Sequence, residues 1–224
     1  MKKQLITEAD VLAAAKRGAR SIPVDANTLL TPSAQEAVQR LHLELSRPVP
    51  GDQPPQSVKA VEVIAPEDKR GPNASKVIAL GSDHGGFPLK LAIRKHLLEL
   101  GYTVADVGTG SEQACDYPDF AFAVASLVAS GQALRGIMID AVGVASAIAA
   151  NKVPGIRAAA CVTEFAARSS REHNDANVLT LGGKVLGAEH AKAIVKVWLE
   201  TWFGGGRHTG RVQKITDIER RFMK

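Results

Sequence analysis

The chain has 224 residues, of which 45% are hydrophobic and 23% are charged, and this ordinary composition excludes disordered, collagen-like and coiled-coil classes. The formal net charge is +5, and most of the excess lies in the last 18 residues, which hold six basic and two acidic side chains. Nucleic-acid binders usually spread basic groups over a face and stack bases on aromatic rings. Because aromatic residues make up only 4% of this chain, that class is disfavoured.

No stretch of about 18 uninterrupted apolar residues occurs, so the sequence predicts no membrane span. The first residues lead into a charged stretch and lack the apolar core of a signal peptide. The only cysteines, Cys115 and Cys161, are too few for a disulfide framework or a thiolate metal site. We therefore expect a cytoplasmic protein with reduced thiols and no bound metal.

A small module is predicted at residues 1–47. Thr7 is a good helix N-cap with Asp10 three residues later. Thr31 precedes Pro32, which suits the first position of a second helix because that position needs no backbone donor. A module of this size buries little core by itself, so we expect it to dock on another surface.

Residues 48–75 are predicted to be a linker. Six of the 11 prolines lie between Ser46 and Ser75, and proline lacks a backbone donor and has a fixed φ. The stretch therefore forms neither a long helix nor a central strand, although residues 58–64 are expected to form a short edge strand. The remainder, residues 76–224, is expected to be one domain.

Strands and helices alternate after this linker. The expected strands are residues 77–81, 103–107, 136–139, 156–162 and 178–181. The expected helices are residues 88–100, 117–130, 144–151, 164–172 and 188–203. The alternation predicts an α/β fold with a parallel five-stranded sheet and helices on both faces. Such sheets bind ligands at the carboxyl ends of their strands.

Polar residues follow two of these strand ends. Asp83 and His84 come after the first strand, ahead of two glycines that allow a ligand close to the backbone, and they suggest a polar site. A tight turn with a capping aspartate is the alternative. Asp140 follows the third strand between apolar segments, where desolvation would raise its pKa toward that of a general base. A solvated cap of the next helix is the alternative for Asp140.

Further candidates lie nearer the end of the chain. Histidine side chains in general suit proton transfer near neutral pH. His173 stands beside Arg171 and Asn174, although a lone histidine is more often structural. Arg207 and Arg211 are four residues apart, so on a helix both guanidiniums face one way, which suits a phosphate. An exposed basic tail is the alternative.

Five strings between about Lys76 and Arg221 resemble, in their order, the type B ribose-5-phosphate isomerase and galactose-6-phosphate isomerase family. The strings are GSDHGGFPLK, DYPDF, AIAANKVPGIRA, SREHNDANVL and GGRHTGRV. The resemblance covers about two-thirds of the chain. It implies a flavodoxin-like, Rossmann-like sheet and a dimer or tetramer with sites between subunits. It also implies interconversion of aldose and ketose phosphates through an enediol, without metal or nucleotide.

The resemblance implies roles for individual residues. The implied substrate-binding residues are Asp83, His84, Tyr117, Gly143, Asn174, Arg207 and Arg211. Asp83 and His84 would contact the sugar and the phosphate, and His173 would be the acid/base that opens the sugar ring. Arg207 and Arg211 would clamp the phosphate, closing over the site of another subunit.

The loop after the third strand departs from the family pattern. The family reads C-G-T-G-x-G there; its cysteine abstracts the C2 proton and its glycine-rich loop stabilises the enediolate. Here Asp140 takes the cysteine position, Gly143 remains, and two glycines have become Ala141 and Ala145. Added methyl groups hinder the approach of an anion to the backbone. Because carboxylates carry out enediol proton transfer in other isomerases, Asp140 is the expected replacement base, in a weak, retuned or inactive isomerase.

The first module has a second resemblance. Residues 5–10 and 29–34 are similar to the opening segment of the corrinoid adenosyltransferase of ethanolamine utilisation and to segments on other bacterial-microcompartment cargo. This similarity implies that residues 1–47 dock to a microcompartment shell or cargo enzyme, or stabilise a dimer. A small accessory module is the alternative.

The sequence as a whole predicts an aldose–ketose isomerase that converts ribose 5-phosphate to ribulose 5-phosphate. His173 would open the ring and Asp140 would transfer the proton between C1 and C2. A small sugar phosphate and further copies of the chain are the expected partners, not nucleic acid or membrane. The alternative, motivated by the altered loop at residues 140–146, is a catalytically inactive sugar-phosphate-binding or microcompartment assembly protein.

Overall fold

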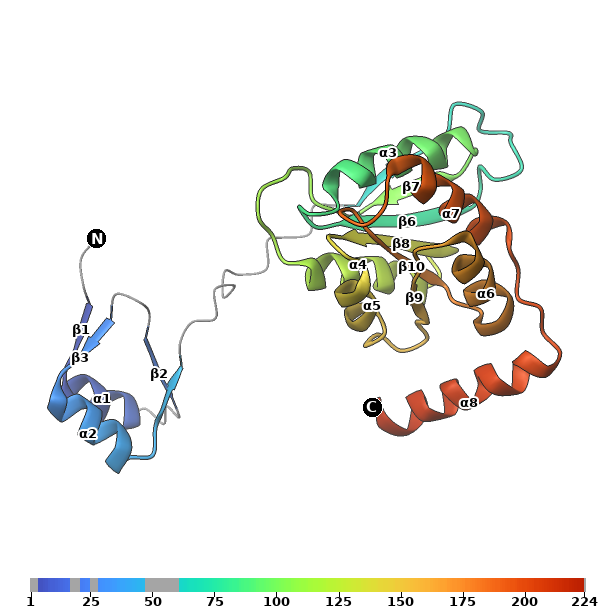
Figure 1. Ribbon diagram of the computed structural model, residues 1–224. Helices are drawn as coiled ribbons and strands as arrows, with labels where there is room; N and C mark the ends of the chain where they lie inside the picture. The colour runs from blue at the N-terminus through green and yellow to red at the C-terminus, as the bar shows by residue number, and fades with distance from the viewer. Residues whose placement is uncertain (1–3, 17–20, 25–27, 47–60, 224) are drawn as a thin grey trace. The chain divides into compact units, whose positions relative to one another are not determined.

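The computed structural model describes residues 4–16, 21–24, 28–46 and 61–223 (Figure 1). The chain divides into two compact units, Met1–Pro54 and Pro55–Lys224. Within the described ranges, no helix is both long and apolar enough to cross a membrane.

The first unit contains two helices and four very short strands among its described residues. They are β1 (Gln4–Ile6), α1 (Glu8–Lys16), β2 (Ser21–Pro23), β3 (Thr28–Leu30), α2 (Pro32–Arg40) and β4 (Glu44–Ser46). β1 pairs with β3 and β2 pairs with β4, both in parallel. Strands of three residues are too short to show a periodic pattern in the sequence.

Both predicted helices of this unit are confirmed, and so is the Thr31 cap of the second. The N–H and the hydroxyl of Thr7 donate to the Asp10 carboxylate at 2.9 and 2.7 Å. The Thr31 hydroxyl accepts from the N–H of Ala34 at 3.2 Å, directly ahead of Pro32. The unit has its own small core of Ile6, Val11, Ile22, Ala34, Ala37 and Val38.

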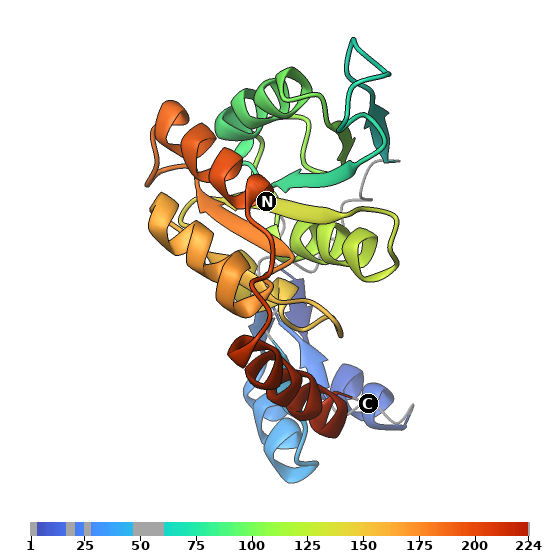
Figure 2. The same ribbon diagram turned by 90° about the vertical axis from the view of Figure 1, so that its right-hand side faces the viewer.

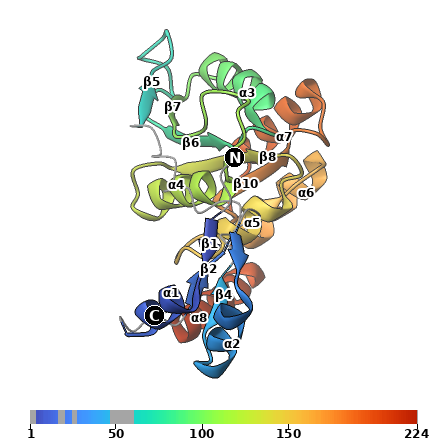
Figure 3. The same cartoon turned by 90° about the vertical axis from the view of Figure 1, so that its left-hand side faces the viewer.

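The second unit is built around a six-stranded sheet. Its strands are β5 (Glu62–Ile64), β6 (Val77–Ser82), β7 (Thr103–Asp106), β8 (Arg135–Asp140), β9 (Ala158–Ala160) and β10 (Val178–Gly182). Their order is β5-β7-β6-β8-β10-β9, and Figure 3 shows the first five of them in turn. The five strands from β6 to β10 are parallel, which confirms the predicted α/β class.

β5 is an antiparallel edge strand that comes from the segment predicted to be a linker. Its three residues pair with residues 104–106 of β7. The short edge strand expected within residues 58–64 is thus present at residues 62–64. The part of the predicted linker at residues 48–60 lies outside the described residues.

Helices cover both faces of the sheet (Figures 1 and 2). They are α3 (Phe87–Glu99), α4 (Tyr117–Ala129), α5 (Val144–Ala150), α6 (Glu164–Asn174) and α7 (Ala188–Glu200). The last helix, α8 (Arg207–Phe222), lies away from the sheet and contacts α6 (Figure 1). Along β6, Ile78 and Leu80 belong to the core cluster formed with α3 and α7, whereas Ala79 belongs to the cluster formed with α4. This alternation is the period of two that a pleated strand imposes on its side chains.

Helix α7 ends earlier than predicted. The pattern predicts residues 188–203, but α7 stops before Thr201, whose backbone is extended. The guanidinium of buried Arg135 donates to the carbonyl oxygens of Trp198, Leu199 and Thr201. A side chain from β8 therefore satisfies the free carbonyls at this helix end, and no local pattern reveals it.

Gly86 lets the turn after β6 pass close to β8. A Cβ at this position would lie 2.1 Å from the Ile139 carbonyl oxygen. Gly86→Ala is therefore expected to lower the free energy of unfolding by about 1–3 kcal/mol. Gly210→Ala on α8 is the control, because a Cβ there meets no described atom within 4 Å apart from the adjacent backbone of its own helix. Helix propensity favours this change by about 0.5–1 kcal/mol. Urea unfolding followed by circular dichroism compares them, and equal stabilities would contradict the close approach.

Candidate active site

One group of predicted site residues gathers at the carboxyl ends of the strands. Asp83 and His84 directly follow β6, and Asp140 ends the neighbouring parallel strand β8. Tyr117 begins α4, and Gly143 precedes α5 with a φ of 89° in the left-handed region. These five residues share the edge at which an open parallel sheet is expected to bind its ligand.

The Asp140 carboxylate accepts its hydrogen bonds from its own loop. Oδ1 accepts from the N–H groups of Val142, at 2.7 Å, and Gly143. Oδ2 accepts from the N–H of Ser146, at 2.9 Å, and from the Ser146 hydroxyl. A carboxylate offers about four acceptor positions, so the loop fills all of them. This geometry is that of a cap at the start of α5.

These contacts predict an acid-dependent loss of stability. Burial favours the neutral form, but the hydrogen bonds from Ser146, Gly143 and Val142 outweigh it and hold the pKa of Asp140 below its ordinary value. Asp140→Asn is expected to lower the free energy of unfolding. The loss is present in full above the unfolded pKa of about 3.9 and disappears as pH falls through the lower folded pKa. Urea unfolding of both proteins against pH measures the difference, and a pH-independent difference would contradict this origin.

The Asp83 carboxylate is bound more loosely. Its Oδ1 accepts from the N–H of Gly86 at 3.0 Å, and its Oδ2 accepts no hydrogen bond from the described residues. Burial raises the pKa of Asp83, and the negative charge of Asp140 adds to this rise. The backbone N–H of Gly86, His84 and, least of all, the backbone N–H of Gly85 oppose it. The two neighbouring carboxyl groups are thus held at different proton affinities.

His84 is exposed and lies against Cys115. Its Nδ1 is 3.1 Å from the carbonyl oxygen, 3.2 Å from the backbone nitrogen and 3.9 Å from the Sγ of Cys115. Burial raises the pKa of the Cys115 thiol, which favours the neutral form beside the imidazole. Cys115 directly precedes the DYPDF string, which the sequence analysis singled out. The contact between Cys115 and His84 was not predicted.

The second group of predicted residues lies at the opposite side of the sheet, near the amino ends of the parallel strands, which we call the amino edge. α6 runs back across the sheet, so His173 and Asn174 at its end come directly before β10. Arg207 and Arg211 lie on the first turns of α8, where the His208 ring stacks on the His173 ring with centroids 4.3 Å apart. The five residues of β10, which separate the two ends of the sheet, span about 16 Å, at ~3.3 Å per residue. One chain therefore does not bring the two groups together.

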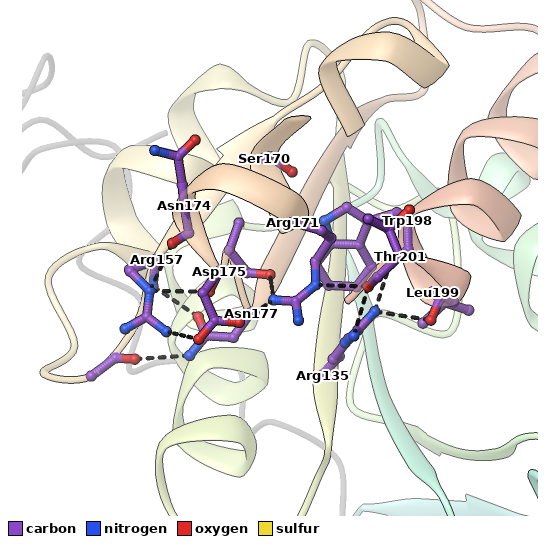
Figure 4. A network of polar contacts seen from close by, with 12 residues as sticks. Arg135, Arg157, Ser170, Arg171, Asn174, Asp175, Asn177, Trp198, Leu199 and Thr201 are labelled. Carbon is purple, nitrogen blue, oxygen red and sulfur yellow. Dashed lines mark hydrogen bonds and ion pairs between the residues drawn. The ribbon is translucent and has the colours of Figure 1, made fainter. Parts of the chain in front are cut away.

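A network of arginines holds the end of α6 (Figure 4). Asp175 forms ion pairs with Arg157 at 2.8 Å and with buried Arg171 at 2.9 Å. The guanidiniums of Arg171 and Arg135 both donate to the Thr201 carbonyl oxygen. The end of α6, which carries the predicted ring-opening histidine, is thereby tied to the end of α7, from which the chain leads into α8.

Three neighbours of predicted residues were not found from the sequence. They are Ser146 beside Asp140, Ser169, whose Oγ is 3.1 Å from the Nδ1 of His173, and His208. The spacing of four residues between Ser169 and His173 on a helix was an available signal. Among the described residues, no group of three or more His, Cys, Asp or Glu side chains could hold a metal ion.

Known proteins match the second unit. Residues 78–215 match the family model described as Ribose/Galactose Isomerase. Ribose-5-phosphate isomerase B of Escherichia coli K12 is 51% identical over 146 residues, which cover 65% of this chain and 98% of the relative. D-erythrulose-4-phosphate isomerase of Pectobacterium atrosepticum is 40% identical over 141 residues, which cover 62% of this chain and 91% of the relative.

Solved structures match the same region. Ribose-5-phosphate isomerase B of Clostridium thermocellum has a TM-score of 0.65 and 52% identity, covering 65% of this chain and 99% of its own. Ribose-5-phosphate isomerase B of Mycoplasma genitalium with bound ribulose-5-phosphate has a TM-score of 0.62 and 40% identity, and the match covers 65% of this chain and 97% of that one. The predicted family and its flavodoxin-like fold are confirmed. The family model matches more than half of the residues of this chain, and the chain therefore belongs to the ribose/galactose isomerase family.

Proposed function

We propose that this protein interconverts ribose 5-phosphate and ribulose 5-phosphate through an enediol, without a metal or nucleotide cofactor. The observation that carries the proposal is a second unit that matches nearly the whole length of relatives named for this activity. The same unit holds the strings with the acid–base and phosphate-binding residues. The reaction needs proton transfers alone, which histidine and carboxylate side chains provide.

The proposed roles follow the two groups of residues. His173 opens the sugar ring, and Arg207 and Arg211, both exposed on one face of α8, bind the phosphate together with His84. The groups proposed to contact the substrate are Asp83, His84, Tyr117, Gly143, Asn174, Arg207 and Arg211. Arginine suits this role because its guanidinium matches the geometry of a phosphate.

We further propose that a second copy of the chain completes the site, in a homodimer or tetramer. Asp83 and His84 lie at the carboxyl edge of the sheet, whereas His173 and Arg207 lie at the amino edge. A pentose phosphate is too short to reach both edges of one chain. In a closed oligomer, the amino edge of one copy can meet the carboxyl edge of another.

Turnover of ribose 5-phosphate by the full-length protein tests the activity, with ribulose 5-phosphate as the expected product. Arg207→Ala is expected to raise KM about 10–100-fold, because a hydrogen bond to a charged group contributes about 1.5–3 kcal/mol. Arg220→Ala is the matched control, since it removes the same charge from the far end of α8. Tight binding of ribose 5-phosphate without turnover would favour the inactive sugar-phosphate-binding or assembly protein.

We also propose that residues 1–47 dock this cytoplasmic protein to a microcompartment shell or to a cargo enzyme. The first unit has its own core. Leu29 and Leu45 lie on its surface with exposed fractions of 50% and 46%. Deletion of residues 1–54 is expected to leave turnover in place and to release a fluorescent fusion from microcompartments in a cell that makes them. An unchanged distribution of the fusion would favour the accessory-module alternative.

A further inference from the structure

Asp83 and Asp140 form a pair of carboxylates that share one place in the fold. The pairing of β6 with β8 ends at Ser82 and Ile139, so the two aspartates stand one register step further on. Alternation along the two strands places both side chains on the face that carries α4 and α5. Both are almost buried, at 6% and 4% exposure.

We propose that Asp83 transfers the proton between C1 and C2 of the sugar, and that Asp140 is a fixed anion that holds the loop at residues 140–146. This inference rests on the isomerase function proposed above and assigns the proton-transfer group within it. It replaces Asp140, which the position of the family cysteine suggested, with its neighbour across the strands.

Asp140 has no free position from which to accept a proton. Its two oxygens receive four hydrogen bonds from Val142, Gly143 and Ser146. Removal of a proton from the substrate would first require one of these bonds to break. Breaking it would leave a nearly buried donor unsatisfied, which costs free energy.

Asp83 has such a position. Its Oδ2 accepts no hydrogen bond from the described residues, while its Oδ1 is fixed by the N–H of Gly86. Oδ2 also keeps contact with solvent, because the described side-chain atoms that are both sealed and unpartnered belong to Ser82, His96 and Trp198. One oxygen therefore orients the carboxylate and the other is open to the site.

The surroundings of the two groups favour the same division of roles. Burial raises the pKa of Asp83, whereas the hydrogen bonds of its loop hold the pKa of Asp140 below the ordinary value in spite of burial. In a pair of carboxyl groups with opposite shifts, the group with the raised pKa is the better proton carrier near neutral pH. The ionised partner keeps its charge throughout.

The step is balanced within the open-chain aldose. The Asp83 carboxylate takes the proton from C2, the C2–H electron pair forms the C1–C2 double bond, and the π pair of the C1 carbonyl moves to O1, which takes up a proton from solvent water. The protonated Asp83 then gives its proton to C1 while O2 loses a proton and becomes the carbonyl oxygen. The net change moves one proton from C2 to C1 and one from O2 to O1, with no oxidant or reductant.

The test compares Asp83→Asn and Asp140→Asn, two nearly isosteric changes, in the full-length protein with ribose 5-phosphate. Asp83→Asn is expected to lower kcat about 10³-fold and to abolish exchange of the C2 proton with deuterated solvent, while calorimetry still detects sugar-phosphate binding. Asp140→Asn is expected to lower kcat by less than about tenfold.

The pH profile adds a readout that a purely structural role would not move. His84 and Asp140 are the charged groups that act on Asp83, and the charge of Asp140 helps to raise the pKa of Asp83. The carboxylate form of Asp83 is required, so activity is lost as pH falls through this pKa. Asp140→Asn removes the raising charge and is expected to move the acidic limb of kcat/KM to lower pH.

Ser146→Ala is the second variant, because Asp140→Asn also weakens the loop. It removes the hydroxyl donor and frees one acceptor position on Oδ2 of Asp140, which keeps its charge and its bond from the N–H of residue 146. A base at Asp140 would therefore become stronger and kcat would change markedly; we expect a change of less than about threefold. The inference is overturned if kcat of the folded Asp140→Asn protein falls about 10³-fold, or if Asp83→Asn keeps more than about a tenth of the wild-type kcat. Both results leave the isomerase function intact. If the wild type turns over no aldose phosphate from tetrose to hexose, the proposed function fails and this inference fails with it.

Discussion

Mixing the inactive variants Asp83→Asn and His173→Ala is expected to restore turnover. Each variant alone is expected to lose at least about 10²-fold activity, because each removes a proton-transfer group. The two residues lie at opposite edges of the sheet in one chain. If each site takes Asp83 from one copy and His173 from another, a mixed two-fold dimer has one intact site, and random mixing restores about a quarter of the wild-type activity.

Co-expression of the two variants with different affinity tags isolates the mixed oligomer for the assay. The matched control mixes His173→Ala with Arg207→Ala, both from the amino edge, where His208 next to Arg207 stacks on His173. No site in that mixture has an intact amino edge, so its activity is expected to stay at the level of the parent variants. An isolated Asp83→Asn and His173→Ala mixture without activity would contradict the shared site.

Asp175→Asn is expected to lower the free energy of unfolding of the second unit by about 3 kcal/mol. Asp175 neutralises two guanidiniums, and the Arg171 side chain is only 5% exposed. Loss of one partner of a buried pair costs about 3–5 kcal/mol because the remaining charge is uncompensated. Asp175 is itself 34% exposed, so solvent screening places the expectation at the lower end of that range.

The substitution isolates the charge. Asp175 has a φ of 49°, and asparagine adopts this left-handed conformation as readily as aspartate does. Asp217→Asn on the exposed face of α8 is the control, with an expected change within about 0.5 kcal/mol. Urea unfolding measures both variants. A loss below about 1 kcal/mol for Asp175→Asn would mean that Arg171 finds other compensation.

Local sequence signals predicted the helix starts and the parallel strands correctly, because in these places a residue type has a single physical function. Thr7 with Asp10 and Thr31 with Pro32 mark helix starts, because free backbone N–H groups there need an acceptor or a residue without a donor. The alternation of apolar segments predicted the parallel strands from β6 to β10. The end of α7 was missed because its carbonyls are satisfied by Arg135, which lies more than 60 residues away in the sequence.

The role of Asp140 shows a different limit. A cap and a general base both place a carboxylate after a strand and before a helix, so the sequence leaves the two open. In the structure, Val142, Gly143 and Ser146 fill the acceptor positions of the Asp140 carboxylate, which favours the cap. Asp83 also follows a strand and precedes a helix. It differs from Asp140 because one of its oxygens accepts no hydrogen bond from the described part of the chain.

The sequence by itself determined the α/β class, the family, the small module ahead of it, and the replacement of the family cysteine by Asp140. These features depend on residue types and their spacing along the chain, which periodicity and motif strings record. The tertiary structure decided that His173 and Asp83 lie at opposite ends of the strands. It also decided that, among the described residues, no donor reaches the second carboxylate oxygen of Asp83, whereas both oxygens of Asp140 have donors. Both depend on how distant strands pair and on where backbone donors point, and neither is a property of any single stretch of sequence.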